Sequence, residues 1–89
     1  MIHVIATIEV AAGRRDDFLA AFHEIVPEVR AEEGCIEYGP ATDLAVTIGN
    51  PPATPRDDVV TVVEKWESVD ALLKHHVAPH MQRYGRAVK

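Results

Sequence analysis

The sequence has 89 residues, a formal net charge of −5 with histidine neutral, and a hydrophobic fraction of 47%. This length makes a single domain over residues 1–89, and the acidic balance excludes a surface built to bind the phosphates of nucleic acid. Cys35 is the single cysteine, which excludes an internal disulfide and fits a reducing compartment. A monomer of this size would bury only about 60% of its unfolded surface, so we expect a partner subunit to add stability.

The N-terminal residues show no targeting signal. The stretch Met1–Val4 carries neither a basic segment nor a long apolar run. No stretch of the chain approaches the ~20 apolar residues that a membrane span needs. We therefore expect a cytoplasmic protein without a membrane partner.

The first third of the chain predicts a strand followed by a helix. Even-numbered apolar side chains share one face of a strand over Ile2–Val10. A helix begins near Arg14 and ends near Gly34, which is the expected left-handed residue, and Pro27 is expected to kink it near its middle. The residues that recur at helical spacing form its apolar stripe: Phe18, Phe22, Ile25, Val26 and Val29.

The middle of the chain predicts two strands. The first runs from Cys35 to about Ile48 and is broken near residues 39–40, and Tyr38 is expected on the opposite face from Cys35. Prolines stiffen the loop 49–55. The stretch Asp58–Trp66 is rich in β-branched residues and is the clearest strand of the chain.

The last third of the chain predicts a helix that is capped by Ser68 and turns Leu72 and Leu73 inward. Pro79 ends this helix, and a further helical turn or two follows over residues 80–89. The element order is therefore βαββα, which indicates an α+β ferredoxin-like domain whose terminal fourth strand is missing. An open sheet edge is a liability unless it is paired, which again favours a homodimer.

The third strand carries two candidate site residues. Glu64 and Trp66 alternate with valines and share one face. If a partner's sheet covers this face, the space between the sheets could be a pocket with Trp66 as a flat apolar wall. We also expect Trp66, Glu64 and His75 to border one cavity between the sheet and the helices. The alternative is that Trp66 is core packing and Glu64 lies at a wet rim.

Histidines near the C-terminus are candidates for proton transfer near neutral pH. His76 and His80 are four residues apart, a spacing that could hold a metal on an unbroken helix, but Pro79 interrupts it and no third ligand is apparent. We therefore expect no metal. Any of these histidines could instead be a solvated or capping residue, which is the interpretation we favour for His76. Tyr38 could orient a polar ligand or be an ordinary half-buried aromatic residue.

Several short motifs, in this order and spacing, resemble the antibiotic biosynthesis monooxygenase family and its small quinol monooxygenase members. These motifs are Glu32–Cys35 with Tyr38, then Glu64–Ser68, then Leu72, His75 and Pro79–Met81. The resemblance implies a dimeric α/β barrel. It also implies oxidation of a phenolic or quinol-type aromatic substrate by molecular oxygen, without flavin, haem or metal.

The resemblance assigns Trp66 and His75 to the catalytic pocket. It places Tyr38, Glu64 and His80 at further motif positions, which we expect to bind substrate. Val62 joins this substrate-binding set because some family members carry an asparagine at that position. The family's terminal strand, which helps to join two subunits, has no counterpart after residue 89.

Cofactor-free oxidation is chemically reasonable because a deprotonated phenol is electron-rich enough to give one electron to oxygen. The protein then supplies a base, a dry aromatic pocket and a hold on the anion. His75 is the candidate base and Trp66 the candidate ring-stacking wall. The alternative is a non-catalytic dimeric module that binds a small aromatic ligand. An RNA-recognition domain shares the topology, but the acidic charge and the lack of paired aromatic residues on a central strand argue against it.

Overall fold

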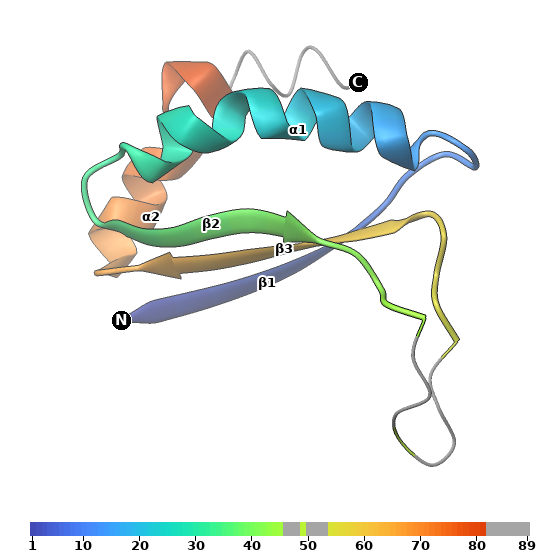
Figure 1. Ribbon diagram of the computed structural model, residues 1–89. Coiled ribbons are helices and arrows are strands. Elements are labelled where there is room, and N and C mark those ends of the chain that lie inside the picture. The colour runs from blue at the N-terminus through green and yellow to red at the C-terminus, as the bar shows by residue number, and fades with distance from the viewer. Residues whose placement is uncertain (46–48, 50–53, 82–89) are drawn as a thin grey trace.

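The computed structural model describes residues 1–45, 49 and 54–81. Its elements are β1 (Ile2–Glu9), α1 (Arg15–Arg30), β2 (Cys35–Ala41), β3 (Val59–Trp66) and α2 (Val69–His76). The three strands form an antiparallel sheet in the order β1-β3-β2, and both helices lie on the same side of it (Figure 1). The predicted ferredoxin-like α+β order is therefore confirmed.

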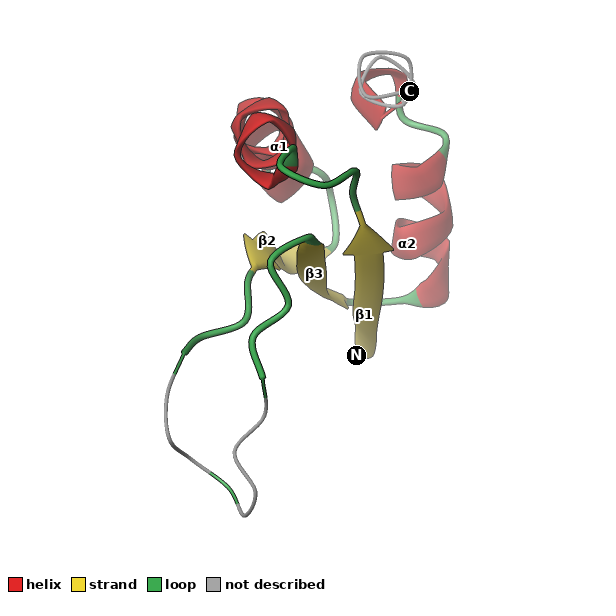
Figure 2. Cartoon of the chain, turned by 90° about the vertical axis from the view of Figure 1, so that its right-hand side faces the viewer, coloured by secondary structure: helices red, strands yellow, loops and turns green. Residues whose placement is uncertain are grey.

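The central strand β3 has one buried and one partly exposed face. Its residues pair with β1 along the full strand, from Ile2 opposite Trp66 to Glu9 opposite Val59. Exposure alternates along both strands, as the period of two in the sequence predicts. Glu64 and Trp66 lie on the buried face, which the helices of the same chain cover (Figure 2). These two residues therefore lie under the helices of their own chain, and not on a face left for a partner's sheet, the arrangement considered above.

Strand β2 differs from the expectation in three ways. It ends at Ala41 instead of reaching Ile48, although residues 46–48 lie outside the described part of the chain. It runs through Pro40 without a break, because an edge strand tolerates a residue that cannot donate to the ladder. A register shift between Cys35 and Glu37 places Cys35 opposite Trp66 and Tyr38 opposite Glu64. Cys35 and Tyr38 therefore share the buried face, because a bulge adds one residue between them.

Helix α1 packs its predicted apolar stripe on the sheet. Phe22, Ile25, Val26 and Val29 are buried, and Phe18 is half-buried at the edge of the same cluster. Pro27 lies in the last turn of the helix rather than near its middle. The Nε–H of Arg30 donates to the carbonyl oxygen of Tyr38 at 3.0 Å, which fixes the end of the helix above β2.

Helix α2 begins at its predicted cap. The hydroxyl oxygen of Ser68 accepts a hydrogen bond from the N–H of Ala71 at 3.2 Å. Leu72 is half-buried against the core, but Leu73 is 59% exposed, so only one of the two expected leucines faces inward. No helix in the described part of the chain is both long and apolar enough to cross a membrane.

The turn between α1 and β2 lies close to α2. Gly34 has a φ of +84°, the left-handed region that favours glycine, although α1 has already ended at Arg30. A Cβ added at Gly34 would lie 2.5 Å from the Cβ of Ala71, a distance that no real pair of Cβ atoms adopts. The turn and the helix can therefore approach this closely only with glycine at this position.

The second face of the sheet has no helix over it within the described residues (Figures 1 and 2). Ile5 on β1 is 66% exposed and Ile36 at the start of β2 is 48% exposed. Lys65 and Glu37 form an ion pair of 2.9 Å between their strands. This face therefore presents large apolar side chains beside charged ones, and it bears on the proposed assembly.

Candidate functional site

The centre of the candidate site is the imidazole of His75, which is 2% exposed. It lies in the last turn of α2 and faces the sheet. Its ring centroid is 4.7 Å from that of Trp66 and 5.4 Å from that of Tyr38, which it meets edge-on. A titratable ring is thus held among aromatic side chains, away from bulk water.

Glu32 connects this histidine to the end of the described chain. Its Oε2 lies 2.9 Å from Nδ1 of His75 and 2.8 Å from Nε2 of His80. An ionised carboxylate only accepts hydrogen bonds, so each ring presents a nitrogen-bound hydrogen to the same oxygen. When Nδ1 of His75 carries its hydrogen, the neutral ring has its lone pair on Nε2. The contact with Glu32 therefore selects the nitrogen that can accept a proton.

Local turns explain how His80 reaches Glu32. After α2 the N–H of Ala78 donates to the carbonyl oxygen of His75 at 3.2 Å, and the N–H of Met81 donates to that of Ala78 at 3.0 Å. Pro79 begins the next helical turn, where its missing N–H costs nothing. The predicted break at this proline is therefore confirmed, and it turns His80 back toward Glu32. Residues 82–89 of the predicted second turn lie outside the described residues.

Glu64 approaches His75 from the sheet. Its Oε1 accepts a hydrogen bond from the indole N–H of Trp66 at 3.0 Å, and both side chains come from the buried face of β3. The same oxygen lies 3.9 Å from Nε2 of His75, which is too long for a hydrogen bond but close enough for strong electrostatic interaction. His75 is therefore placed between two carboxylates, one near each ring nitrogen.

The charges of this cluster also act on Cys35. Burial raises the pKa of the Cys35 thiol, and the nearby carboxylates of Glu32 and Glu64 raise it further. A thiol with a raised pKa stays protonated and is a poor nucleophile and a poor metal ligand. Cys35 therefore contributes packing at this site.

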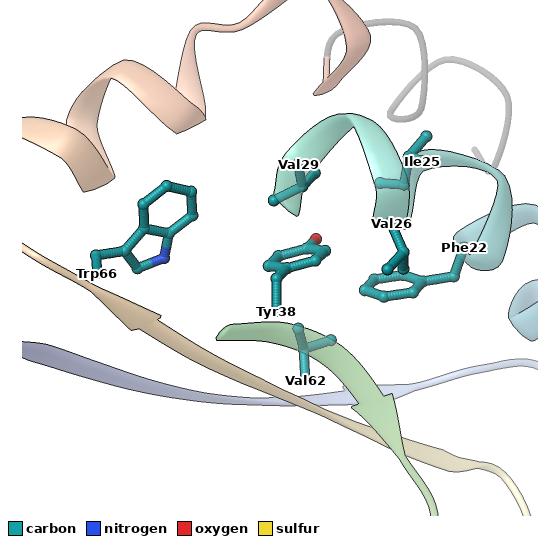
Figure 3. Close-up of a cluster of buried hydrophobic side chains, with 7 residues drawn as sticks. All are labelled: Phe22, Ile25, Val26, Val29, Tyr38, Val62 and Trp66. Carbon is teal, nitrogen blue, oxygen red and sulfur yellow. The ribbon is translucent and has the colours of Figure 1, made fainter. Parts of the chain in front are cut away.

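Tyr38 and Val62 lie deeper in the core. Tyr38 rises from β2 between Trp66 and the helix, and its ring stacks on Phe22 with centroids 5.4 Å apart (Figure 3). Val62 is buried in the same cluster. The structure thus brings Tyr38 close to His75 and Trp66, and it places Val62 in the hydrophobic core.

Trp66 is fully buried, with the imidazole of His75 against it at a tilt of 35°. The three residues expected to border a cavity therefore do come together. The cavity itself and the role of Trp66 as a ring-stacking wall stay predictions.

The histidine pair that converges is not the one suggested by spacing. His76 is exposed, whereas His75 and His80 meet at Glu32. Their ligand atoms and that of Glu32 lie within 4.8 Å of one another, which is a separation that a metal ion can bridge. Glu32 is the residue that sequence reasoning missed as a site residue. Its only sequence signal is its place in the Glu32–Cys35 motif, because it is 43 and 48 residues away from its partners.

Comparison with known proteins identifies the family. The profile described as antibiotic biosynthesis monooxygenase matches residues 1–87. The chain belongs to this family. It is 40% identical over 91 residues to the protein named "Probable quinol monooxygenase YgiN" of Escherichia coli (strain K12), covering 100% of this chain and 86% of that protein. It is 30% identical over 84 residues to YcnE of Bacillus subtilis (strain 168), covering 94% of this chain and 78% of that protein.

Solved structures of antibiotic biosynthesis monooxygenase proteins share the fold. A crystal structure from Caulobacter crescentus CB15 superposes with a TM-score of 0.79 at 24% identity. The match covers 97% of this chain and 73% of the Caulobacter chain. This likeness supports the arrangement of sheet and helices described above.

Proposed function

We propose that the protein is a cofactor-independent monooxygenase that oxidises a phenolic or quinol-type aromatic substrate with molecular oxygen. The observation that carries this proposal is the buried His75, whose Nδ1 is held by Glu32 while its Nε2 lies near Glu64 and its ring lies beside Trp66. Family membership and the similarity to a protein named as a quinol monooxygenase support the substrate class.

The proposed reaction begins with proton transfer from the substrate hydroxyl to Nε2 of His75. The carboxylate of Glu32, 2.9 Å from Nδ1, stabilises the imidazolium that forms. The phenolate then gives one electron to oxygen, and the resulting phenoxyl radical and superoxide recombine to form a C–O bond. The imidazolium of His75 returns its proton to the peroxide, and loss of water from the resulting hydroperoxide leaves a quinone, so one oxygen atom enters the product and the other leaves as water.

The apolar surface of β1 is the proposed seat of the aromatic ring. Val4 lies opposite Glu64 and Ala6 lies opposite Val62, so their side chains share the face that carries the site. These β1 residues are only half-buried, whereas Val62 and Trp66 are buried. A ring on this surface lies beside Glu64, which can accept a hydrogen bond from a second substrate hydroxyl. In this arrangement the rings of Trp66 and Tyr38 pack against His75 and hold it in place. His80 lies closer to solvent than His75 does.

The proposed active form is a homodimer. The second face of the sheet exposes Ile5 and Ile36, and β1 is an edge strand of the described sheet. A second copy that covers this face removes apolar surface from water and protects the edge. Sedimentation at micromolar concentration should give about twice the 9.8 kDa chain mass. A folded species at the single-chain mass would contradict the dimer.

Oxygen consumption tests the proposed activity. A panel of substituted hydroquinones and phenols is incubated with purified protein, without added flavin and with a chelator present. Protein-dependent oxygen uptake and quinone formation are expected for at least one compound of the panel. Saturable binding without oxygen uptake would instead favour the alternative, a module that binds an aromatic ligand.

A further inference from the structure

Three side chains from separate segments converge on one point. Glu32 comes from the turn after α1, His75 from the last turn of α2, and His80 from the helical turn that begins at residue 79. We propose that Glu32, His75 and His80 form a binding site for one divalent transition-metal ion of the Zn²⁺ class. The ion would bind to Oε2 of Glu32, Nδ1 of His75 and Nε2 of His80.

The distances are close to those that a metal requires. Zn²⁺ binds imidazole nitrogen and carboxylate oxygen at about 2.0–2.2 Å, which in a tetrahedral site separates neighbouring ligand atoms by about 3.3 Å. Oε2 of Glu32 is now 2.9 Å and 2.8 Å from the two nitrogens, and all three atoms lie within 4.8 Å of one another. Small side-chain rotations therefore convert the hydrogen-bonded triad into a ligand set.

Burial gives the site both order and access. The side chain of His75 is 2% exposed, so one ligand is held rigidly by its aromatic neighbours. The side chains of Glu32 and His80 are 14% and 15% exposed, which leaves a path for an ion from solvent. Three protein ligands at a partly open site leave a fourth position for water.

The surroundings of His75 suit a metal ligand. A ligating histidine commonly donates its other ring N–H to a carboxylate, which fixes its orientation. Glu64 occupies that place, with Oε1 3.9 Å from Nε2 of His75. A metal on Nδ1 puts the hydrogen on Nε2, where a small movement brings it to Glu64. The polar groups around His75 thus fit the metal-bound tautomer as well as the metal-free one.

The donor set selects the class of ion. Two imidazoles and one carboxylate favour Zn²⁺, Co²⁺ or Ni²⁺ over soft ions that prefer sulfur. Cys35 does not change this preference, because its sulfur is not among the atoms that converge on this point. The site therefore differs from a thiolate zinc site, and replacement of Cys35 serves as a control.

Metal binding has a consequence that rests on the proposed function. With an ion on Nδ1, Nε2 of His75 carries a hydrogen and no longer accepts one from a substrate. Bound Zn²⁺ should therefore inhibit oxygen uptake, and a chelator should restore it. Metal binding itself does not depend on the oxygenase activity, so the two claims can fail separately.

The test uses the full-length protein without a histidine tag. Trp66 is the only tryptophan, and its ring lies 4.7 Å from His75, so its fluorescence reports on the site. Zn²⁺ is titrated by calorimetry, and Co²⁺ is titrated while tryptophan quenching and the visible absorption of the ion are followed. The variants are Glu32→Gln and His80→Ala, which remove ligands and leave the buried His75 unsubstituted. The matched controls are Glu33→Gln, His76→Ala and Cys35→Ser, with circular dichroism as a check on folding.

We expect one ion per chain in the parent and in the three controls. Glu32→Gln and His80→Ala should each weaken binding at least tenfold, because each removes one of three ligands. Absence of binding in the parent at 100-fold excess Zn²⁺ would overturn the proposal. So would binding that survives both ligand variants in folded protein, or binding that His76→Ala abolishes.

Discussion

Two carboxylates of this protein each accept hydrogen bonds from more than one nitrogen, in different surroundings. Asp43 binds the exposed guanidinium of Arg56 at 2.7 and 3.0 Å and accepts the backbone N–H of the same residue at 3.0 Å. Glu32 binds two imidazoles at similar distances, but one of these is almost fully buried. Asp43 links the two ends of the segment between β2 and β3. Glu32, in contrast, orients a ring that can exchange a proton.

The comparison shows that burial, more than the number of contacts, distinguishes a candidate site from an ion pair on the surface. The Arg56 side chain is 56% exposed, so water and salt compete with its ion pair. His75 is shielded by Trp66 and Tyr38, so its interactions are not screened in this way. Substitutions in the two clusters should therefore differ in their effects on activity and on the free energy of unfolding.

The largest expected effect is on activity. Replacing His75 with alanine should lower kcat/KM by about 10²- to 10⁴-fold, because the proposed general base is removed. His76→Ala is the matched control and should leave the rate nearly unchanged, since its exposed ring meets His75 edge-on at 5.5 Å between centroids but lies outside the converging group of Glu32, His75 and His80. Steady-state oxygen uptake measures both variants. Equal rates for His75→Ala and the parent would show that another group takes the proton.

A smaller effect is expected on stability. Glu32→Gln should lower the free energy of unfolding by about 1–3 kcal/mol, because the neutral amide cannot replace a charged acceptor shared by two rings. Glu33→Gln changes the same charge at an exposed neighbouring position and should have little effect. Urea unfolding at neutral pH measures both. If the two variants lost the same stability, the contacts of Glu32 would be no stronger than those of a surface charge.

The smallest effect is expected at Asp43, where it depends on pH. The hydrogen bonds from Arg56 lower the pKa of Asp43 to about 2, below the value of about 3.9 for an unfolded chain. The stabilisation is therefore fully present above pH ~4 and is lost as pH falls toward the folded-state value. The difference in unfolding free energy between the parent and Asp43→Asn should shrink over this range and should also shrink with added salt. A difference that is constant with pH would exclude this ion pair as its source.

The sequence predicted most of the fold because its patterns are local. The alternation along β1 and β3 and the apolar stripe of α1 each define which side faces the core, and Ser68 marks the start of α2. The face of Tyr38 was predicted wrongly because one extra residue interrupts the period-two alternation of its strand. The bulge between Cys35 and Glu37 reverses the face expected for Tyr38, and no feature of a period-two pattern reveals it.

The site was only partly predictable from the sequence. Glu64 and Trp66 were named from their shared strand face and His75 from its side-chain chemistry, the family resemblance assigned Trp66 and His75 to the pocket, and the structure brings all three together. Glu32 was not recognised as a site residue, because its partners lie on elements that only the folded chain brings near it. The pairing of His80 with Glu32 depends on the turn at Pro79, which sequence spacing alone showed only as an interruption.

The close contact at Gly34 has an evolutionary consequence. Glu32 lies two residues before this glycine, and His75 lies one helical turn after Ala71, whose Cβ occupies the space that a side chain at position 34 would need. A side chain at position 34 would push the turn that carries Glu32 away from the helix that carries His75. It would do so without altering any polar atom of the site. Among homologues, position 34 should therefore stay glycine even where position 71 is also glycine, because its φ of +84° disfavours any larger residue whatever the space. This glycine should be retained although it contributes no functional group.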